Sequence, residues 1–224
     1  MKKIIAVLLA VLMIVSLSAC GKTPTEDDVR GEQTKNESTP QNSEVEFSLG
    51  TVEGPVYENR FIGLGCRLKE GWTFYSDEQI RELNNVATEL AGEEFEDLMK
   101  NADLIHDMYA TSSDQMSNIN VNLEKAQMLQ LAAIDLASNF ENAFAILEQS
   151  FSNMGYTNIS HEVGTITIDN KEFTSLSVTG EINGVKMYQK QIAVKCYGYL
   201  ANIAVTTFNE DTTDDIYADF YVVK

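Results

Sequence analysis

The pattern of apolar and polar residues divides the chain into three stretches. Residues 4–17 are almost entirely apolar, residues 21–44 are almost entirely polar, and apolar residues recur at regular spacing from about residue 45 onward. Regular spacing of apolar side chains is typical of helices and strands that bury one face. We therefore expect a single globular domain over 46–224, preceded by two segments with other roles.

The first part of this domain predicts extended structure followed by helix. Residues 56–68 and 72–75 have a strand-like pattern broken by glycines. Ser76 and Gln79 have the spacing of a capping box, which predicts a helix that runs to about residue 90. A second, shorter helix is expected at 95–102, and residues 104–111 fit either a helix or a strand.

The centre of the domain predicts one strand and two helices. Between residues 118 and 123 three asparagines alternate with apolar residues, which predicts a strand buried on one face: Asn118, Asn120 and Asn122 against Ile119, Val121 and Leu123. The asparagine side fits a polar binding surface or, the interpretation we favour, a solvated sheet face. Residues 128–136 are apolar on most sides and predict a buried helix.

A second helix follows, with Asn139 as a candidate cap and Gly155 at its end. Its apolar stripe consists of Phe140, Phe144, Leu147, Phe151 and Met154.

The last part of the domain predicts an antiparallel meander. Strands are expected at 159–168, 172–182, 185–195 and 199–208, and Asn183-Gly184 is a strong signal for a two-residue hairpin turn. The stripe from Phe140 to Met154 is the best cover for its apolar face, and a final helix is expected at 214–221. The fold class predicted is α+β, a mainly antiparallel sheet with a C-terminal four-strand meander packed against helices.

The N-terminus carries the signs of export and lipidation. Lys2 and Lys3 precede the apolar run, which is shorter than the roughly 20 residues a membrane-spanning helix needs. The run ends in Leu17-Ser18-Ala19-Cys20, which resembles the bacterial lipobox. That resemblance implies cleavage before Cys20 and a diacylglycerol on its thiol. The alternatives are an ordinary secretory signal or an uncleaved anchor.

The domain boundaries follow from this interpretation. Residues 1–19 are the signal peptide, 20–45 the lipidated cysteine and a disordered tether, and 46–224 the globular domain. As a flexible coil the tether would span ~25–30 Å. The expected location is the cell membrane, with the domain lipid-anchored and facing outside the cytoplasm.

Composition and charge restrict the partners. The chain has 16 basic and 34 acidic residues and a formal net charge of −18. This argues against nucleic acid, whose binding needs clustered Lys and Arg. Cys66 and Cys196 are either buried free thiols or one disulfide. The membrane, through the lipid, is one expected partner, and an envelope protein or polymer is another.

The sequence contains no motif for catalysis, for a cofactor or for a metal. Gly63-Leu64-Gly65 lacks the third glycine of a dinucleotide fingerprint, and the acidic residues between 210 and 219 lack the spacing of a calcium loop. Paired carboxylates, which hydrolyse glycosides, have no signature in a single sequence. A secreted hydrolase of that kind therefore stays open as an alternative function.

The order of predicted elements resembles the Mog1/PsbP-like α/β sandwich found in many bacterial lipoproteins. The resemblance covers about 57–221 and its marks are Tyr57-x-Asn59-x-Phe61, Gly65, Gly71-Trp72 and the closing strand Tyr199–Phe208. It implies a role in binding or assembling other proteins, and no catalytic residue comes with it. The expected function is a non-enzymatic binding or assembly module.

Overall fold

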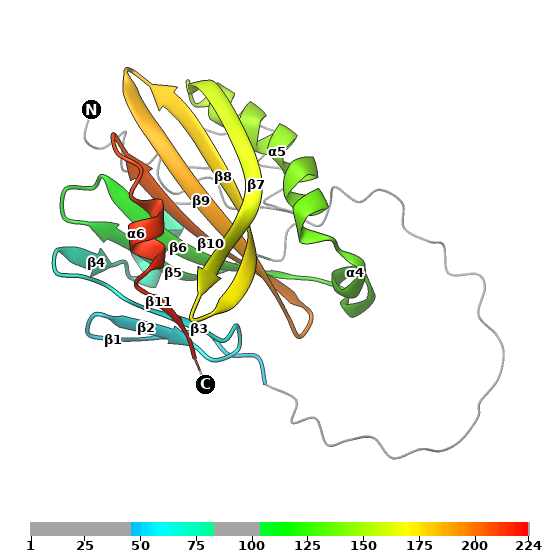
Figure 1. The fold of residues 1–224 in the computed structure, drawn as a ribbon. Helices are drawn as coiled ribbons and strands as arrows, with labels where there is room; N and C mark the ends of the chain where they lie inside the picture. The colour runs from blue at the N-terminus through cyan, green and yellow to red at the C-terminus, as the bar shows by residue number, and fades with distance from the viewer. Residues whose placement is uncertain (1–45, 83–103, 224) are drawn as a thin grey trace, which may run out of the picture.

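A seven-stranded antiparallel sheet runs through the centre of the protein (Figure 1). In this computed structural model, residues 46–82 and 104–223 are described. The spatial order of the strands is β4 (Trp72–Phe74), β5 (Leu104–Ser112), β6 (Ser117–Lys125), β10 (Tyr199–Phe208), β9 (Val185–Cys196), β8 (Lys171–Ile182) and β7 (Thr157–Ile168). A smaller sheet, in the order β1 (Thr51–Glu53), β2 (Val56–Asn59), β3 (Leu64–Arg67) and β11 (Phe220–Val222), packs on one face of it.

The predicted α+β class and the C-terminal meander are both confirmed. Strands β7 to β10 pair in sequence order. Asn183 and Gly184 both have positive φ, at 52° and 79°, as a type I′ hairpin turn requires. Residues 104–111, which fitted helix or strand, belong to β5.

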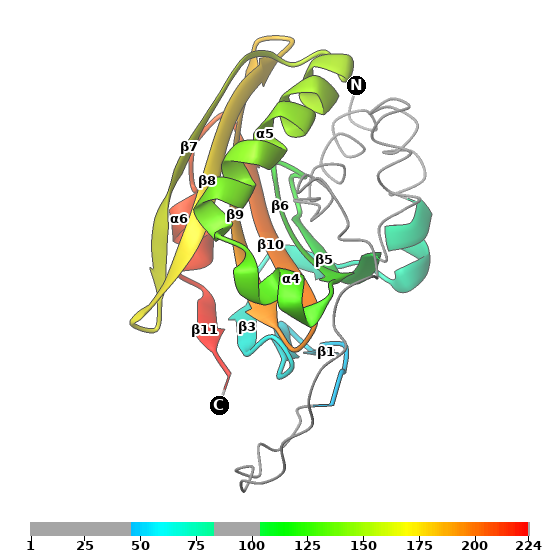
Figure 2. The same cartoon turned by 90° about the vertical axis from the view of Figure 1, so that its right-hand side faces the viewer.

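Helix α5 (Leu136–Asn153) lies across β7 and β8, on the face of the large sheet away from the small one (Figure 2). Phe140, Leu147 and Phe151 are at most 1% exposed and pack against Leu176 and other residues of the meander. The predicted cover of the meander by this stripe is therefore confirmed.

The start of α5 corrects the sequence prediction. The N-cap is Asp135, whose carboxylate accepts the backbone N–H of Ser138 at 2.8 Å, and Asn139 lies buried in the first turn. Asp135 also breaks the apolar segment 128–136. Helix α4 (Met128–Ala133) buries Leu131, but it leaves Met128 and Leu129 exposed, so the prediction of a buried helix there was wrong.

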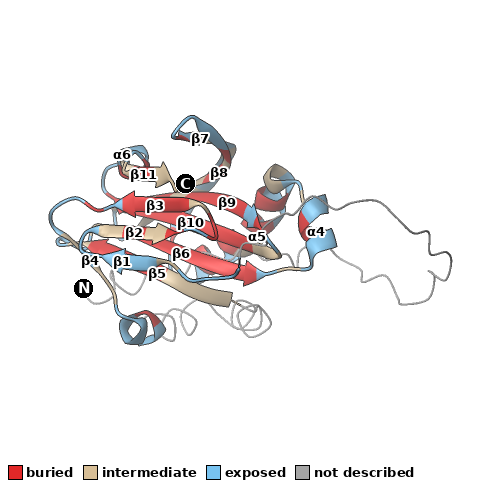
Figure 3. Ribbon diagram, turned by 90° about the horizontal axis from the view of Figure 1, so that it is seen from below, coloured by how far each residue is buried: buried red, intermediate tan, exposed pale blue. Residues whose placement is uncertain are grey.

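The second core lies between the two sheets. Ile119, Val121 and Leu123 face Tyr57 and Leu64 of the small sheet in one buried cluster. Strands β6 and β10 are buried along almost their whole length (Figure 3). The short helix α6 (Thr213–Tyr217) belongs to this side, and the Tyr217 hydroxyl donates to the carbonyl oxygen of Ile203 at 2.9 Å.

The C-terminus departs from the predicted helix at 214–221. Helix α6 ends at Tyr217, and β11 then pairs with β3, placing Phe220 opposite Cys66. Tertiary pairing overrides the local helix signal because Phe220 becomes buried and the edge of β3 gains a partner.

Near the other end of the domain, the capping box is confirmed, since the backbone N–H of Gln79 donates to the Ser76 hydroxyl at 3.3 Å. The rest of that helix, and the helix expected at 95–102, lie outside the described residues.

Asp107 joins the two sheets. A bulge in β5 between His106 and Met108 lets Asp107 face the small sheet together with Met108. Its carboxylate accepts hydrogen bonds from Gly50 N at 2.7 Å, Tyr57 Oη at 2.5 Å and Asn59 Nδ2 at 2.6 Å. Burial, together with this carboxylate, raises the pKa of Tyr57 well above its ordinary value, so the phenol remains a donor.

We expect Phe151→Ala to lower the free energy of unfolding by ~3–5 kcal/mol, because it empties space under a helix that covers the meander. Urea unfolding of the mature chain measures this loss. Glu148→Ala, at an exposed position of the same helix, is the matched control and should stay close to wild type. Equal unfolding midpoints for the two variants would contradict this packing.

Asp107→Ala should destabilise the protein by roughly 3 kcal/mol or more, because three donors lose a charged acceptor at once. Thermal unfolding measures the loss, and Glu162→Ala, which removes an exposed carboxylate, should change the melting temperature little. If both variants melt together, Asp107 does not hold the sheets together.

Candidate functional site

Six buried amide side chains gather on one face of the large sheet. They are Asn118, Asn120 and Asn122 of β6, Gln189 and Gln191 of β9, and Asn202 of β10, and none is more than 4% exposed. We call this group the amide face. Gln189 and Gln191 stand opposite Val178 and Leu176, which pack under α5, so the amide face lies on the α5 side of the sheet.

The sequence analysis favoured a solvated face for the three asparagines, and that prediction was wrong. Alternation along β6 identified correctly which residues share a face. It could not show that β6 lies inside the sheet, between β5 and β10, and is buried on both sides. The glutamines on β9 and Asn202 were missed because they join the asparagines only through strand pairing.

The pairing of the strands places these amides around two alanines, Ala193 and Ala204. Asn122 stands directly opposite Asn202, and Asn202 is opposite Ala193. Asn120 stands opposite Ala204, which is in turn opposite Gln191. Because alanine side chains extend little from the sheet, the longer amides project around a floor formed by Ala193 and Ala204.

Part of the amide face is linked by hydrogen bonds. Gln191 Nε2 donates to Gln189 Oε1 at 2.6 Å, and Gln189 Nε2 donates to Thr206 Oγ1 at 2.9 Å. At the β5 side, His106 Nδ1 and Asn122 Oδ1 are 2.7 Å apart. These contacts hold the two glutamines and Asn122 in fixed orientations.

Within residues 46–82 and 104–223, the remaining three asparagines keep four atoms without a hydrogen-bond partner. These are Asn118 Nδ2, Asn120 Oδ1 and both side-chain polar atoms of Asn202. Asn120 Nδ2 makes only a long contact of 3.5 Å to Asn118 Oδ1. A buried polar group without a partner costs ~1–3 kcal/mol, and such groups are rare in native proteins. Four of them on one face make the amide face a candidate binding site.

The ionisable groups beside the amide face limit its chemistry. Burial lowers the pKa of His106, an effect that its contact with Asn122 partly opposes, so the imidazole is neutral near pH 7. Among the described residues of β5, β6, β9 and β10, Glu124 is the carboxylate on this face. The described part of the face therefore offers donors and acceptors for binding and assembles no pair of carboxylates.

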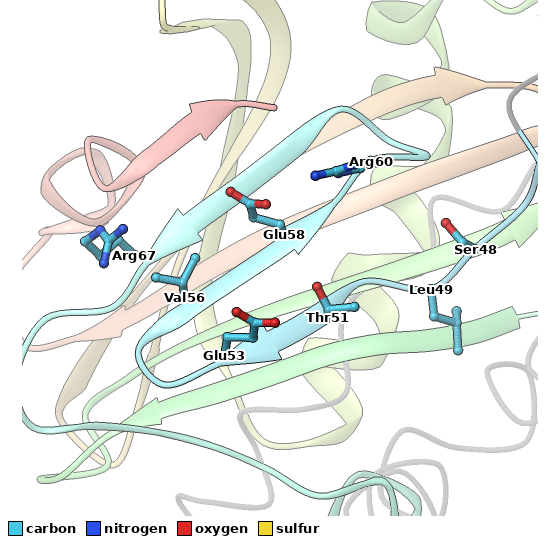
Figure 4. A pocket seen from close by; sticks show the side chains of 8 residues that line it. All are labelled: Ser48, Leu49, Thr51, Glu53, Val56, Glu58, Arg60 and Arg67. Carbon is cyan, nitrogen blue, oxygen red and sulfur yellow. The ribbon is translucent and has the colours of Figure 1, made fainter. Parts of the chain in front are cut away.

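A hollow lies on the outer surface of the small sheet (Figure 4). It encloses about 590 Å³ and is lined by Ser48, Leu49, Thr51, Glu53, Val56, Glu58, Arg60 and Arg67. Glu53 and Glu58 share one face of the β1–β2 hairpin, diagonally across the pair. Glycoside hydrolysis needs one carboxyl group in a dehydrated environment, whereas Glu53 is exposed to solvent and Glu58 is only partly buried. This pair gives the hydrolase alternative no support.

The two cysteines of the domain are buried and unpaired. Cys66 and Cys196 carry free thiols, and burial raises the pKa of each to about 12. A thiol in this state is a poor nucleophile. Cys20, the predicted lipidation site, lies outside the described residues.

Within the described ranges, no helix has the length and apolar character needed to cross a bilayer. In the same residues, no three His, Cys, Asp or Glu side chains come together as a metal site.

His106 should make stability depend on pH. In the unfolded chain, His106 binds a proton with its ordinary pKa of 6.5, whereas in the folded chain its pKa is lower. The contribution of His106 to the free energy of unfolding is therefore fully present above pH 6.5. As pH falls from 6.5 towards the lower folded pKa, stability is lost. In urea titrations at a series of pH values, the free energy of unfolding of wild type should fall relative to that of His106→Gln over this range. If the two proteins depend on pH in the same way, His106 is not the group responsible.

Comparison with known proteins gives distant likenesses of fold. No family model and no curated protein matches the sequence. Among solved structures, the fold is similar to LpqN, which is involved in cell envelope biogenesis of Mycobacterium tuberculosis, with a TM-score of 0.40 and 13% sequence identity. The match covers 72% of this chain and 83% of that one.

Proposed function

We propose that this protein is a lipid-anchored binding module outside the cytoplasmic membrane, and that its amide face binds a neutral, hydroxyl-rich ligand such as a sugar unit of an envelope polymer. The observation that carries the proposal is the set of four unpaired polar atoms on Asn118, Asn120 and Asn202. The anchoring rests on the lipobox-like sequence that ends at Cys20.

The chemistry of amides favours this class of ligand. Each asparagine or glutamine side chain both donates and accepts hydrogen bonds, and so does each sugar hydroxyl. Amides carry no charge, so they provide no strong attraction for a phosphate or a carboxylate. The formal net charge of −18 further disfavours anionic ligands.

Burial of the asparagines sets a condition on binding. Asn118, Asn120 and Asn202 are at most 3% exposed, so a ligand reaches them only when this part of the protein opens locally. The unpaired atoms raise the free energy of the closed, ligand-free state, because they have lost their hydrogen bonds to water. A ligand that pairs with them recovers this free energy, and we therefore expect it to stabilise the folded protein.

Asn202→Leu separates binding from packing. Neither polar atom of Asn202 has a partner in the part of the chain that the structure describes, so a leucine of similar size should leave the ligand-free melting temperature unchanged or raise it. The same change should abolish the stabilisation that neutral oligosaccharides give to the wild-type mature chain. Differential scanning fluorimetry with a panel of such oligosaccharides measures both effects.

Asn122→Leu is the matched control, because Asn122 contacts His106 and its loss should lower the ligand-free melting temperature. A marked loss of ligand-free stability in Asn202→Leu would mean that Asn202 is a structural residue. Ligand-induced shifts that survive in Asn202→Leu would place binding elsewhere.

Cys20→Ala tests the anchor. Mass spectrometry of the wild-type mature chain should find an N-terminal cysteine that carries a diacylglycerol. The variant should accumulate as an unprocessed precursor or as protein released from the membrane. A wild-type chain that begins at another residue and carries no lipid would overturn the anchoring.

A further inference from the structure

We propose that one apolar end of the domain rests on the surface of the lipid bilayer. This surface, the apolar end, consists of Phe47, Met128, Leu129 and Tyr197, whose exposed fractions are 38%, 65%, 87% and 54%. The proposal goes beyond ligand binding because it fixes how the domain is oriented at the membrane. It rests on the lipid at Cys20.

Contacts bring these residues together from separate parts of the chain. The Phe47 ring stacks on Tyr199 at 4.7 Å, and Phe61 lies between Phe47 at 5.2 Å and Tyr197 at 5.8 Å. The start of α4 joins them, because Ala126 N donates to the carbonyl oxygen of Gly198 at 2.8 Å. Figures 1 and 2 both show α4 beside the turn between β9 and β10.

The exposure of this group is unusual for a water-facing surface. A single exposed leucine is ordinary, but an aromatic cluster next to two exposed residues of one helix forms a continuous apolar area. Tyr197 also occupies a turn position with φ of 32°, where the two preceding turns of the meander place asparagine or aspartate. A bulky residue in this conformation costs free energy, and its ring contacts Phe61.

Charge around the apolar end differs from that of the whole chain. Lys125 ends β6 opposite Tyr199, Lys195 stands opposite Leu200 one residue before the end of β9, and Arg60 precedes Phe61. The described acidic residues near them are Glu46, Glu58, Glu124 and Asp135. Glu124 stands opposite Leu200, and Glu58 lines the same hollow as Arg60. With three cations and four anions, this end is closer to charge balance than the whole chain, which has 16 basic and 34 acidic residues, so an anionic lipid surface repels it less.

The position of the tether identifies the occupant. Glu46 is the first described residue and leads directly into Phe47, so the segment from Cys20 reaches the domain at the apolar end. With a tether span of ~25–30 Å, the membrane is the apolar surface that this end meets most often. Tyrosine favours the depth of the lipid headgroups, phenylalanine and leucine enter the boundary with the acyl chains, and lysine and arginine extend their charges into water from there.

Fluorescence of the lipidated mature chain in vesicles tests this orientation. Trp72 is the only tryptophan, and it pairs with Ser112 at the opposite end of the sheet, about 26 Å of strand from Tyr199. Leu129→Trp adds a second reporter at the apolar end. In vesicles of phosphatidylcholine and phosphatidylglycerol that contain brominated phosphatidylcholine, the added emission should be quenched several-fold more than that of Trp72 in wild type.

A second variant shows that the contact depends on the apolar side chains. Replacing Met128 and Tyr197 with serine in the Leu129→Trp protein should remove most of that extra quenching. Equal quenching of both reporters, or no quenching of the one at residue 129, would overturn the proposal. Flotation of the same samples reports anchoring separately, so protein that fails to float with the vesicles identifies failure of the lipid anchor instead.

Discussion

Burial of strands β6 and β10 on both faces is the constraint on which the rest of the structure depends. One face meets the small sheet through Ile119, Val121 and Leu123, and the other carries the amide face. Because side chains alternate along a strand, one short sequence has to satisfy two different environments. The apolar side does so completely, whereas the amide side leaves four polar atoms without partners among the described residues. Stability and the proposed function therefore come from opposite faces of the same strands.

The bulge at Asp107 makes this division compatible with the small sheet. A regular strand would place His106 and Met108 on one face; the inserted residue allows His106 to contact Asn122 while Asp107 and Met108 turn towards Tyr57. The bulge thus positions a structural carboxylate on one side and a neutral imidazole on the other. The same few residues hold the two sheets together and form the border of the amide face.

Local signals predicted much of the fold. Asn183-Gly184 specified its turn through backbone conformation alone, and the stripe that includes Phe151 specified the buried side of α5. The predictions failed where distant pairing decides the outcome. Strand β11 forms because β3 needs a partner, and the asparagines of β6 are buried because strands from later in the chain lie beside them. The candidate site could not be predicted as a unit, because its members come from three strands whose register is set by the whole sheet.

The central claim is that the unpaired amides bind a neutral ligand, and side-chain amide NMR tests it most directly. Asn120 and Asn202 should show large shifts of their Nδ2 resonances when a stabilising oligosaccharide is added to the mature chain. Asn59, whose Nδ2 already donates to Asp107 on the other side of the sheet, is the internal reference and should not move. If the ligand binds while the resonances of Asn120 and Asn202 stay in place, the amide face is not the binding site.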